Sequence, residues 1–149
     1  MDFRLVIDTR EQEPYTFDCA SIRHCLEAGD YSVQGYESRV AVERKSLVDL
    51  CRTVIHERAR FERELVKLTA HGAACVVVEA DLDRVLRGEH AGELRGVSPA
   101  SLLGAALHIQ IQHGIPVIWC GSRPAARHFT EQFLRMYVRL AGAPPCPQQ

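Results

Sequence analysis

The sequence predicts one α/β domain in which helices flank a central mixed β-sheet. Three observations favour this fold class. Short apolar runs typical of buried strands alternate along the chain with amphipathic segments typical of helices. Two of the apolar runs lie close enough in sequence to form a hairpin, which adds an antiparallel pair to a sheet whose later strands are separated by helices. The chain has 149 residues, a length that suits a single domain with its own core.

Composition and charge exclude several classes of protein. Hydrophobic residues make up 46% of the chain and charged residues 25%, which excludes a mostly disordered protein. No apolar run approaches the ~20 residues of a membrane span, and the first residues lack the pattern of a secretory signal. The six cysteines show no C-x-x-C or zinc-like spacing, so we expect reduced thiols in a cytoplasmic protein. The net charge is -1, and binding of nucleic acid would need basic residues gathered locally or a partner that adds affinity.

In the N-terminal part of the chain, apolar runs and turn residues predict three strands and one weak helix. The run F-R-L-V-I is closed by Asp8 and is typical of a buried strand. The next apolar segments flank a turn near Gly35 and form the hairpin. We expect a strand at 3–7, a loop at 9–18, a weak helix at 19–28 ended by Gly29, a strand around 31–33 and its hairpin partner at 39–45.

The remainder of the chain predicts four helices that alternate with two strands. Ser46, Ser98 and Ser122 stand at helix starts where a serine side chain caps the first turn. The run A-C-V-V-V-E is continuously apolar, as expected of a central strand covered on both faces. We expect a helix from 46 to about 53, a helix at 57–70, a strand at 74–79, a mobile surface loop at 86–97, a helix at 98–113, a strand at 116–120, a helix at 122–141 and a disordered tail at 142–149.

Three carboxylates stand at the ends of predicted strands. Asp8 follows the first strand, and Asp30 and Glu43 lie on the two strands of the hairpin, so these two can approach each other. Glu43 and Lys45 point to one face of their strand and Arg44 to the other. A hard divalent cation takes carboxylate oxygens as ligands, and the backbone carbonyl of Arg44 could add another. Phosphodiester hydrolysis uses such a metal and benefits from a nearby lysine, so the set predicts a metal-dependent site, although charges at strand ends can also form surface ion pairs.

Longer segments surround these residues in a recognisable order. They read I-D-T-R-E-Q-E-P at 7–14, A-G-D-Y-S-V at 28–33, V-E-R-K-S-L-V-D-L at 42–50, R-F-E-R-E-L at 60–65 and S-P-A-S-L-L-G-A-A-L at 98–107. Together they resemble the nuclease domain of the XPF family of structure-specific endonucleases, which has the PD-(D/E)xK, restriction-endonuclease-like fold. The hallmark E-R-K-x-x-x-D of that family matches residues 43–49, and its G-D matches 29–30. The resemblance covers about residues 4–140 and divides the chain into a nuclease domain at 1–141 and a tail at 142–149.

The resemblance implies a metal-dependent DNA endonuclease that hydrolyses phosphodiester bonds at branched, flap or fork DNA, in repair or recombination. Asp30 and Glu43 would bind Mg²⁺ or Mn²⁺. Lys45 would be the catalytic lysine, and Asp8 would be a further acidic residue of the same site. Two other interpretations remain open, a non-catalytic DNA-binding or dimerisation subunit and a nuclease of the same fold in defence or phage biology.

Three further residues have two interpretations each. Asp49 matches the last position of the family hallmark, but it also fits a capping box that starts at Ser46. Arg10 is a candidate DNA-binding residue, or else half of a loop ion pair. Arg60 would contact a DNA phosphate through two parallel hydrogen bonds, or else pair with Glu64 one helical turn away.

The resemblance also implies partners. It implies a homodimer formed through the two C-terminal helices, and the helix at 122–141 has more apolar positions than one packing stripe requires. The chain carries no helicase or helix-hairpin-helix segment, which favours a separate helicase or DNA-binding partner. In a prokaryote the protein would be associated with the nucleoid.

The histidines do not predict a second metal site. His108 and His113 are five residues apart on a predicted helix, whereas two ligands on one helical face are commonly four apart. We therefore expect surface or helix-end roles for both.

Overall fold

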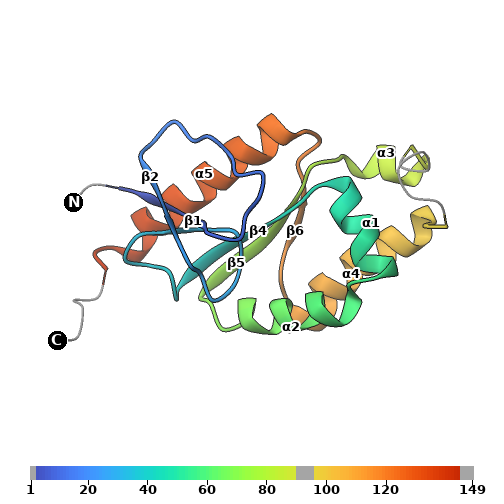
Figure 1. The fold of residues 1–149 in the computed structure, drawn as a ribbon, viewed down its shortest axis with the longest axis horizontal. Coiled ribbons are helices and arrows are strands. Elements are labelled where there is room, and N and C mark those ends of the chain that lie inside the picture. The colour runs from blue at the N-terminus through green and yellow to red at the C-terminus, as the bar shows by residue number, and fades with distance from the viewer. Residues whose placement is uncertain (1–2, 90–95, 145–149) are drawn as a thin grey trace.

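A six-stranded sheet in the order β2-β1-β3-β4-β5-β6 runs through the protein, with helices on both of its faces (Figure 1). The computed structural model describes residues 3–89 and 96–144. The strands are β1 (Leu5–Asp8), β2 (Ser21–His24), β3 (Tyr31–Val33), β4 (Val40–Lys45), β5 (Ala73–Val78) and β6 (Val117–Trp119). The helices are α1 (Leu47–Ile55), α2 (Arg58–Leu68), α3 (Leu82–Leu86), α4 (Pro99–His113) and α5 (Arg123–Ala141).

The sheet is mixed, as the sequence predicts. β3 is antiparallel to both β1 and β4, whereas β1 is parallel to β2 and β4 is parallel to β5. β5 and β6 are also parallel and are joined through α3 and α4. The α/β class with a mixed sheet flanked by helices is therefore confirmed.

The alternation of side chains along β5 divides the core into two parts. Val76 and Val78 pack with α1, α2 and α4 on one face of the sheet. Cys75 and Val77 pack on the other face, against α5 and the aromatic side chains of the loop after β1. Because both faces are covered, this central strand is apolar throughout, which is why the sequence shows a continuous apolar run there.

Serine caps fix the starts of three of the four helices that the sequence predicts, α1, α4 and α5. Ser46 accepts a hydrogen bond from the backbone N–H of Asp49, and the Asp49 carboxylate accepts one from Ser46 N, which completes a capping box. The Ser98 side chain caps α4 by accepting a hydrogen bond from Ser101 N, and α4 ends at Gly114 in the left-handed conformation with φ 67°. These predicted helix boundaries are confirmed to within about two residues.

One predicted element is wrong. Residues 19–28 were expected as a weak helix, but Ser21–His24 form β2, a mostly exposed strand at the edge of the sheet. This strand pairs in parallel with β1, and Leu5 N donates to Ala20 O just before it. The backbone of β1 would otherwise lack partners on that side, and satisfying those groups outweighs the weak helical preference of the segment.

Three other features were not predicted or are only partly described. The short helix α3 was not expected from the sequence, and its N-cap is the side chain of Asp81. Half of the mobile loop predicted at 86–97, residues 90–95, lies outside the described residues, and its first residue, Leu86, is the last residue of α3. The tail predicted at 142–149 is described only as far as Pro144.

No helix in the described ranges 3–89 and 96–144 is both long and apolar enough to cross a membrane.

Candidate functional site

The ends of β1 and β3 bring Asp8 and Asp30 together. Asp8 is the last residue of β1, and Asp30 directly precedes β3, which is antiparallel to β1. The backbone N–H of Asp8 donates to the carbonyl of Asp30 over 2.8 Å. Asp8 is buried, and its carboxylate accepts hydrogen bonds from Leu26 N (2.9 Å) and from Arg10 Nε (2.9 Å). The orientation of this carboxylate is therefore set by two partners, Arg10 in the same loop and the backbone of Leu26.

The hairpin strand β4 adds Glu43 and Lys45 to the same place. Asp30 N donates to Val42 O over 2.9 Å, and the Asp30 carboxylate accepts from Arg44 N over 2.7 Å. The backbone of Arg44 thus lies against the Asp30 carboxylate, and its neighbours Glu43 and Lys45 both line the resulting cavity. The predicted approach of Asp30 and Glu43 across the hairpin is what the structure shows.

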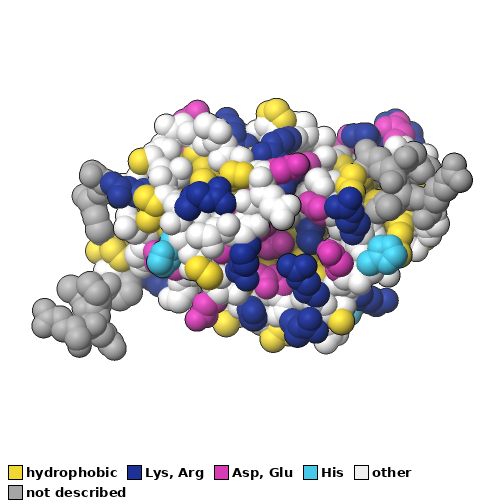
Figure 2. All heavy atoms as spheres, viewed as in Figure 1, with side chains coloured by type: hydrophobic (Ala, Val, Ile, Leu, Met, Phe, Trp, Pro, Cys, Tyr) yellow, Lys and Arg dark blue, Asp and Glu magenta, His cyan; other side chains and the backbone are white. Residues whose placement is uncertain are grey.

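The cavity has a volume of about 190 Å³ and is rich in charge. Figure 2 shows acidic side chains gathered near the middle of one face, with lysine and arginine side chains around them. The strand ends form one wall, and α2 forms the other. The residues that line the cavity are Asp8, Arg10, Gly29, Asp30, Glu43, Lys45, Glu57, Arg60, Phe61 and Glu64.

Burial makes the two hairpin carboxyl groups difficult to ionise. Burial, followed by the negative charge of Glu11, raises the pKa of Asp30 to about 7, although the N–H of Arg44 and the charge of Lys45 oppose the shift. Burial, followed by the charge of Asp30, raises the pKa of Glu43 well above its usual range. Two such carboxyl groups side by side favour a bound cation, because a cation would offset both causes of the shift.

The side chain of Arg44 lies on the other face of β4, as the alternation along a strand predicts. Its Nε and Nη2 atoms each lie 3.0 Å from a carboxylate oxygen of Glu79, in a bidentate pair. Glu79 also accepts a 2.6 Å hydrogen bond from the Tyr15 hydroxyl, and the Glu11 carboxylate lies 3.6 Å from Arg44 Nη1. This buried network fixes β4 from behind while Glu43 and Lys45 face the cavity.

Comparison with known proteins places the chain in a family. The model of the ERCC4 domain family matches residues 7–133, which is most of the chain. The chain belongs to the ERCC4 domain family. Comparison with curated proteins gives no match.

Solved structures of similar fold agree with this assignment. XPF from Aeropyrum pernix matches with a TM-score of 0.70 and 22% sequence identity, over 91% of this chain and 65% of that chain. XPF from the same organism in complex with DNA matches with a TM-score of 0.68 and 20% identity, over 92% of this chain and 66% of that chain. This ERCC4 domain thus has the XPF nuclease fold and spans just under two thirds of each XPF chain.

Helix α2 of this ERCC4 domain contributes residues that the sequence did not single out. Glu64 accepts a 3.0 Å hydrogen bond from Gly29 N, and so holds the turn that carries Asp30. Gly29 has φ 79°, and a Cβ there would lie 3.0 Å from the Cβ of Ala41, so this close turn requires glycine. Phe61 and Glu57 also line the cavity. The segment R-F-E-R-E-L resembles the family, but nothing in its spacing shows which helical face turns toward the strands.

The two candidate DNA-binding arginines lie at the cavity in different settings. Arg10 forms an ion pair with Asp8 and donates to Leu26 O over 2.7 Å, which matches the loop ion pair considered from the sequence. Arg60 is 79% exposed, and its nearest acidic partner is Glu57 at 4.0 Å rather than Glu64. Of the two, Arg60 has the side chain that can turn toward a large ligand.

Among the described residues that line the cavity, Asp49 does not appear. Its carboxylate accepts a 3.2 Å hydrogen bond from Ser46 N, and its own N–H donates to Ser46 Oγ over 3.1 Å. This geometry is that of a capping box, as one interpretation of Asp49 predicts. A catalytic role for Asp49 stays a prediction that a variant can test.

Proposed function

We propose that this ERCC4 domain is a divalent-metal-dependent DNA endonuclease. The observation that carries the proposal is the convergence of Asp8, Asp30, Glu43 and Lys45 from three strands on one cavity walled by α2. Membership of the ERCC4 family supports it, and so does the likeness to an XPF that binds DNA. The reaction would be hydrolysis of a phosphodiester bond.

The residues of the cavity fit a hard divalent cation such as Mg²⁺ or Mn²⁺. Asp30 and Glu43 offer carboxylate oxygens, and the backbone carbonyl of Arg44, the residue directly after Glu43, would be a further ligand. Burial and neighbouring negative charges raise the pKa of both carboxyl groups, and a bound cation would offset these causes. When bound, the metal would activate water and neutralise charge that develops on the phosphate.

Lys45 is placed to act on the nucleophile or on charge rather than as a ligand. Its ammonium lies 4.2 Å from the centroid of the Phe61 ring, which orients it by a cation–π contact at the cavity wall. An ammonium held there attracts water or a phosphate oxygen that enters beside Glu43. Asp8, held by Leu26 N and Arg10, adds a fixed negative charge behind Asp30.

DNA would approach over the exposed side of α2. Arg60 stands at the rim of the cavity, and Arg63 and Lys67 are exposed on the same helix. These side chains gather positive charge locally in a chain whose net charge is -1, which suits contact with phosphates. Arg10 would contribute by holding Asp8 more than by contacting DNA directly.

The remaining functional assignments concern substrate and assembly. We assign branched, flap or fork DNA as the substrate class and repair or recombination as the setting, following the family. A homodimer through the two C-terminal helices is supported by exposed apolar side chains, with Ile111 on α4 81% exposed and Leu140 on α5 79% exposed. A separate helicase or DNA-binding partner, which the family resemblance implies, is also part of this proposal.

Cleavage of labelled DNA tests the proposed activity. Fork, flap, single-stranded and plain duplex DNA are incubated at low salt with Mg²⁺ or Mn²⁺ and either wild type, Asp30→Asn or Glu43→Gln. Asp83→Asn, an exposed change on α3, is the matched control. We expect cleavage by wild type and the control alone, with preference for a junction.

Two outcomes would contradict the proposal. Cleavage that persists in Asp30→Asn and Glu43→Gln would remove the cavity from the reaction. Tight DNA binding without cleavage under any metal, with or without candidate partners, would make the protein a non-catalytic binding subunit.

A further inference from the structure

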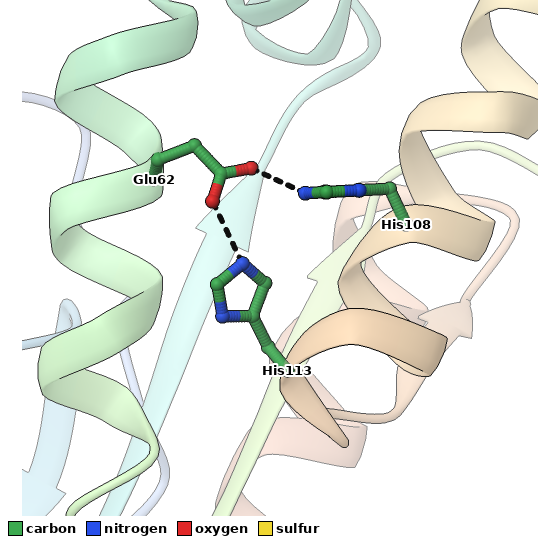
Figure 3. Close-up of side chains that lie close together, drawn as sticks. All are labelled: Glu62, His108 and His113. Atoms are coloured by element: carbon green, nitrogen blue, oxygen red, sulfur yellow. Dashed lines mark hydrogen bonds and ion pairs between the residues drawn. The ribbon is translucent and has the colours of Figure 1, made fainter.

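Helices α2 and α4 bring three metal-ligating side chains together outside the acidic cavity. His108 Nε2 lies 2.5 Å from Glu62 Oε1, and His113 Nε2 lies 2.8 Å from Glu62 Oε2 (Figure 3). One ligand atom from each residue can be chosen so that all three lie within 4.8 Å of one another. The three side chains therefore converge through the atoms with which they bind metal ions.

The secondary structure explains why this convergence is possible. His113 is the last residue of α4, and the chain turns at Gly114 directly afterwards. Both histidines point toward α2, and their ring centroids are 5.5 Å apart at a steep interplanar angle (Figure 3). The third group, Glu62, comes from another helix, 46 residues before His108. The five-residue spacing of the histidines gave no reason to expect a site, because the element that completes it is remote in sequence.

The donor set selects a class of metal ion. Two imidazole nitrogens and one carboxylate oxygen suit Zn²⁺, which binds such ligands at about 2.0–2.2 Å and accepts water in a fourth position. Mg²⁺ prefers an all-oxygen shell and is a poor match. Burial raises the pKa of Glu62. Hydrogen bonds from His113 and His108 lower it by more, so the net pKa lies below its usual range. A glutamate carboxyl is ordinarily ionised at neutral pH, as a metal ligand must be.

We propose that Glu62, His108 and His113 bind one Zn²⁺ ion at the junction of α2 and α4, separately from the acidic cavity. Zn²⁺ takes the place of the hydrogens that join the two Nε2 atoms to Glu62, and neutral imidazoles then carry their hydrogen on Nδ1. Glu62 and His108 are partly exposed, so an ion can reach the site from solvent, whereas His113 is mostly buried.

The site has a consequence for the neighbouring cavity. Glu62 directly follows Arg60 and Phe61, both of which line the acidic cavity. An ion that joins Glu62 to α4 therefore fixes the helix that forms one wall of that cavity. The Zn²⁺ site is thus structural, and it stands whether or not the protein is a nuclease.

Direct metal binding tests the proposal without any enzymatic readout. The full chain carries Asp30→Asn and Glu43→Gln, so that the acidic cavity cannot bind the metal, and is stripped with a chelator. Titration calorimetry with Zn²⁺ should then show one ion per chain, with no displacement by excess Mg²⁺. Adding His108→Ala, His113→Ala or Glu62→Gln should weaken Zn²⁺ binding more than the ~10–100-fold typical of losing a group that only supports a ligand. His128→Ala, at an exposed position on α5, is the matched control and should bind Zn²⁺ normally.

Two measurements keep the proposal falsifiable if a variant folds poorly. In the chain that carries only Asp30→Asn and Glu43→Gln, here called the parent chain, Zn²⁺ should shift the imidazole NMR signals of His108 and His113. The signals of His128 should stay unchanged. Zn²⁺ should also raise the Tm of the parent chain and of His128→Ala, but not that of His108→Ala. Unshifted signals, no binding by the parent chain, or equal binding by His108→Ala and His128→Ala would overturn the proposal.

Discussion

The carboxylate of Asp30 accepts a 2.7 Å hydrogen bond from the backbone N–H of Arg44. This contact joins the turn before β3 to the centre of the E-R-K segment in β4. It aligns Asp30 with Glu43 and Lys45, whose side chains leave β4 on the face opposite to that of Arg44. This hydrogen bond, together with that from Asp30 N to Val42 O, therefore positions Asp30 beside the other proposed metal ligand.

The free energy of unfolding should depend on pH because the pKa of the buried Asp30 carboxyl is raised. This carboxyl has a pKa of about 7 in the folded protein, above the 3.8 of an unperturbed group. Between these values the folded state holds a proton that the unfolded state has lost, so the stability from this group falls as pH rises toward 7. Asp30→Asn should therefore make the metal-free protein more stable than wild type at pH 7.5, by on the order of 1–3 kcal/mol, with a smaller difference at pH 5.

Thermal unfolding with a chelator measures this difference. Mg²⁺ or Mn²⁺ should raise the Tm of wild type more at pH 7.5 than at pH 5, and should leave Asp30→Asn nearly unchanged. A wild-type Tm that rises from pH 5 to pH 7.5 by the same amount as that of Asp30→Asn would refute the assigned protonation.

Lys45→Ala should separate metal binding from catalysis. The lysine is assigned to the nucleophile or to developing charge, so its loss should lower the cleavage rate by about 100-fold or more and leave metal affinity intact. Calorimetry with Mn²⁺ and a single-turnover cleavage assay check the two parts. Lost metal affinity in this variant would contradict the role, and Arg87→Ala, at the exposed end of α3, is the control.

Asp49→Ala should behave as the loss of a helix cap. Removing either half of the capping box costs about 0.5–2 kcal/mol of stability. If Asp49 only caps α1, Ser46→Ala and Asp49→Ala should lower the free energy of unfolding similarly and leave the cleavage rate per folded molecule unchanged. A large rate loss in Asp49→Ala alone would instead support the catalytic role that the E-R-K-x-x-x-D motif implies.

Arg60→Ala should weaken DNA binding without affecting stability. The side chain is 79% exposed at the cavity rim, so its loss should lower affinity and reduce the slope of log K against log[salt] by about 1. Binding to flap DNA at several salt concentrations gives the slope. Arg87→Ala on α3 is the control, and an identical slope in both variants would show that Arg60 does not contact a phosphate.

The arrangement of the acidic residues illustrates what can be predicted without a structure. Glu43 and Lys45 had to share a face because side chains alternate along a strand, and the hairpin brought Asp30 within reach. By contrast, residues 19–28 were wrongly expected as a helix, because the need of β1 for a partner is not visible in that segment. The contact of Glu64 with Gly29 was missed for a similar reason, since it depends on how α2 packs.

The sequence by itself determined the mixed α/β fold, the helix caps and the acidic set, because strand alternation, capping and turn residues act over a few neighbouring positions. Only the tertiary structure decided which face of α2 closes the cavity, that Glu64 meets Gly29, and that Glu62 meets His108 and His113. Each of these contacts joins segments that are set by packing across the core, and no local periodicity encodes the angle at which two elements pack.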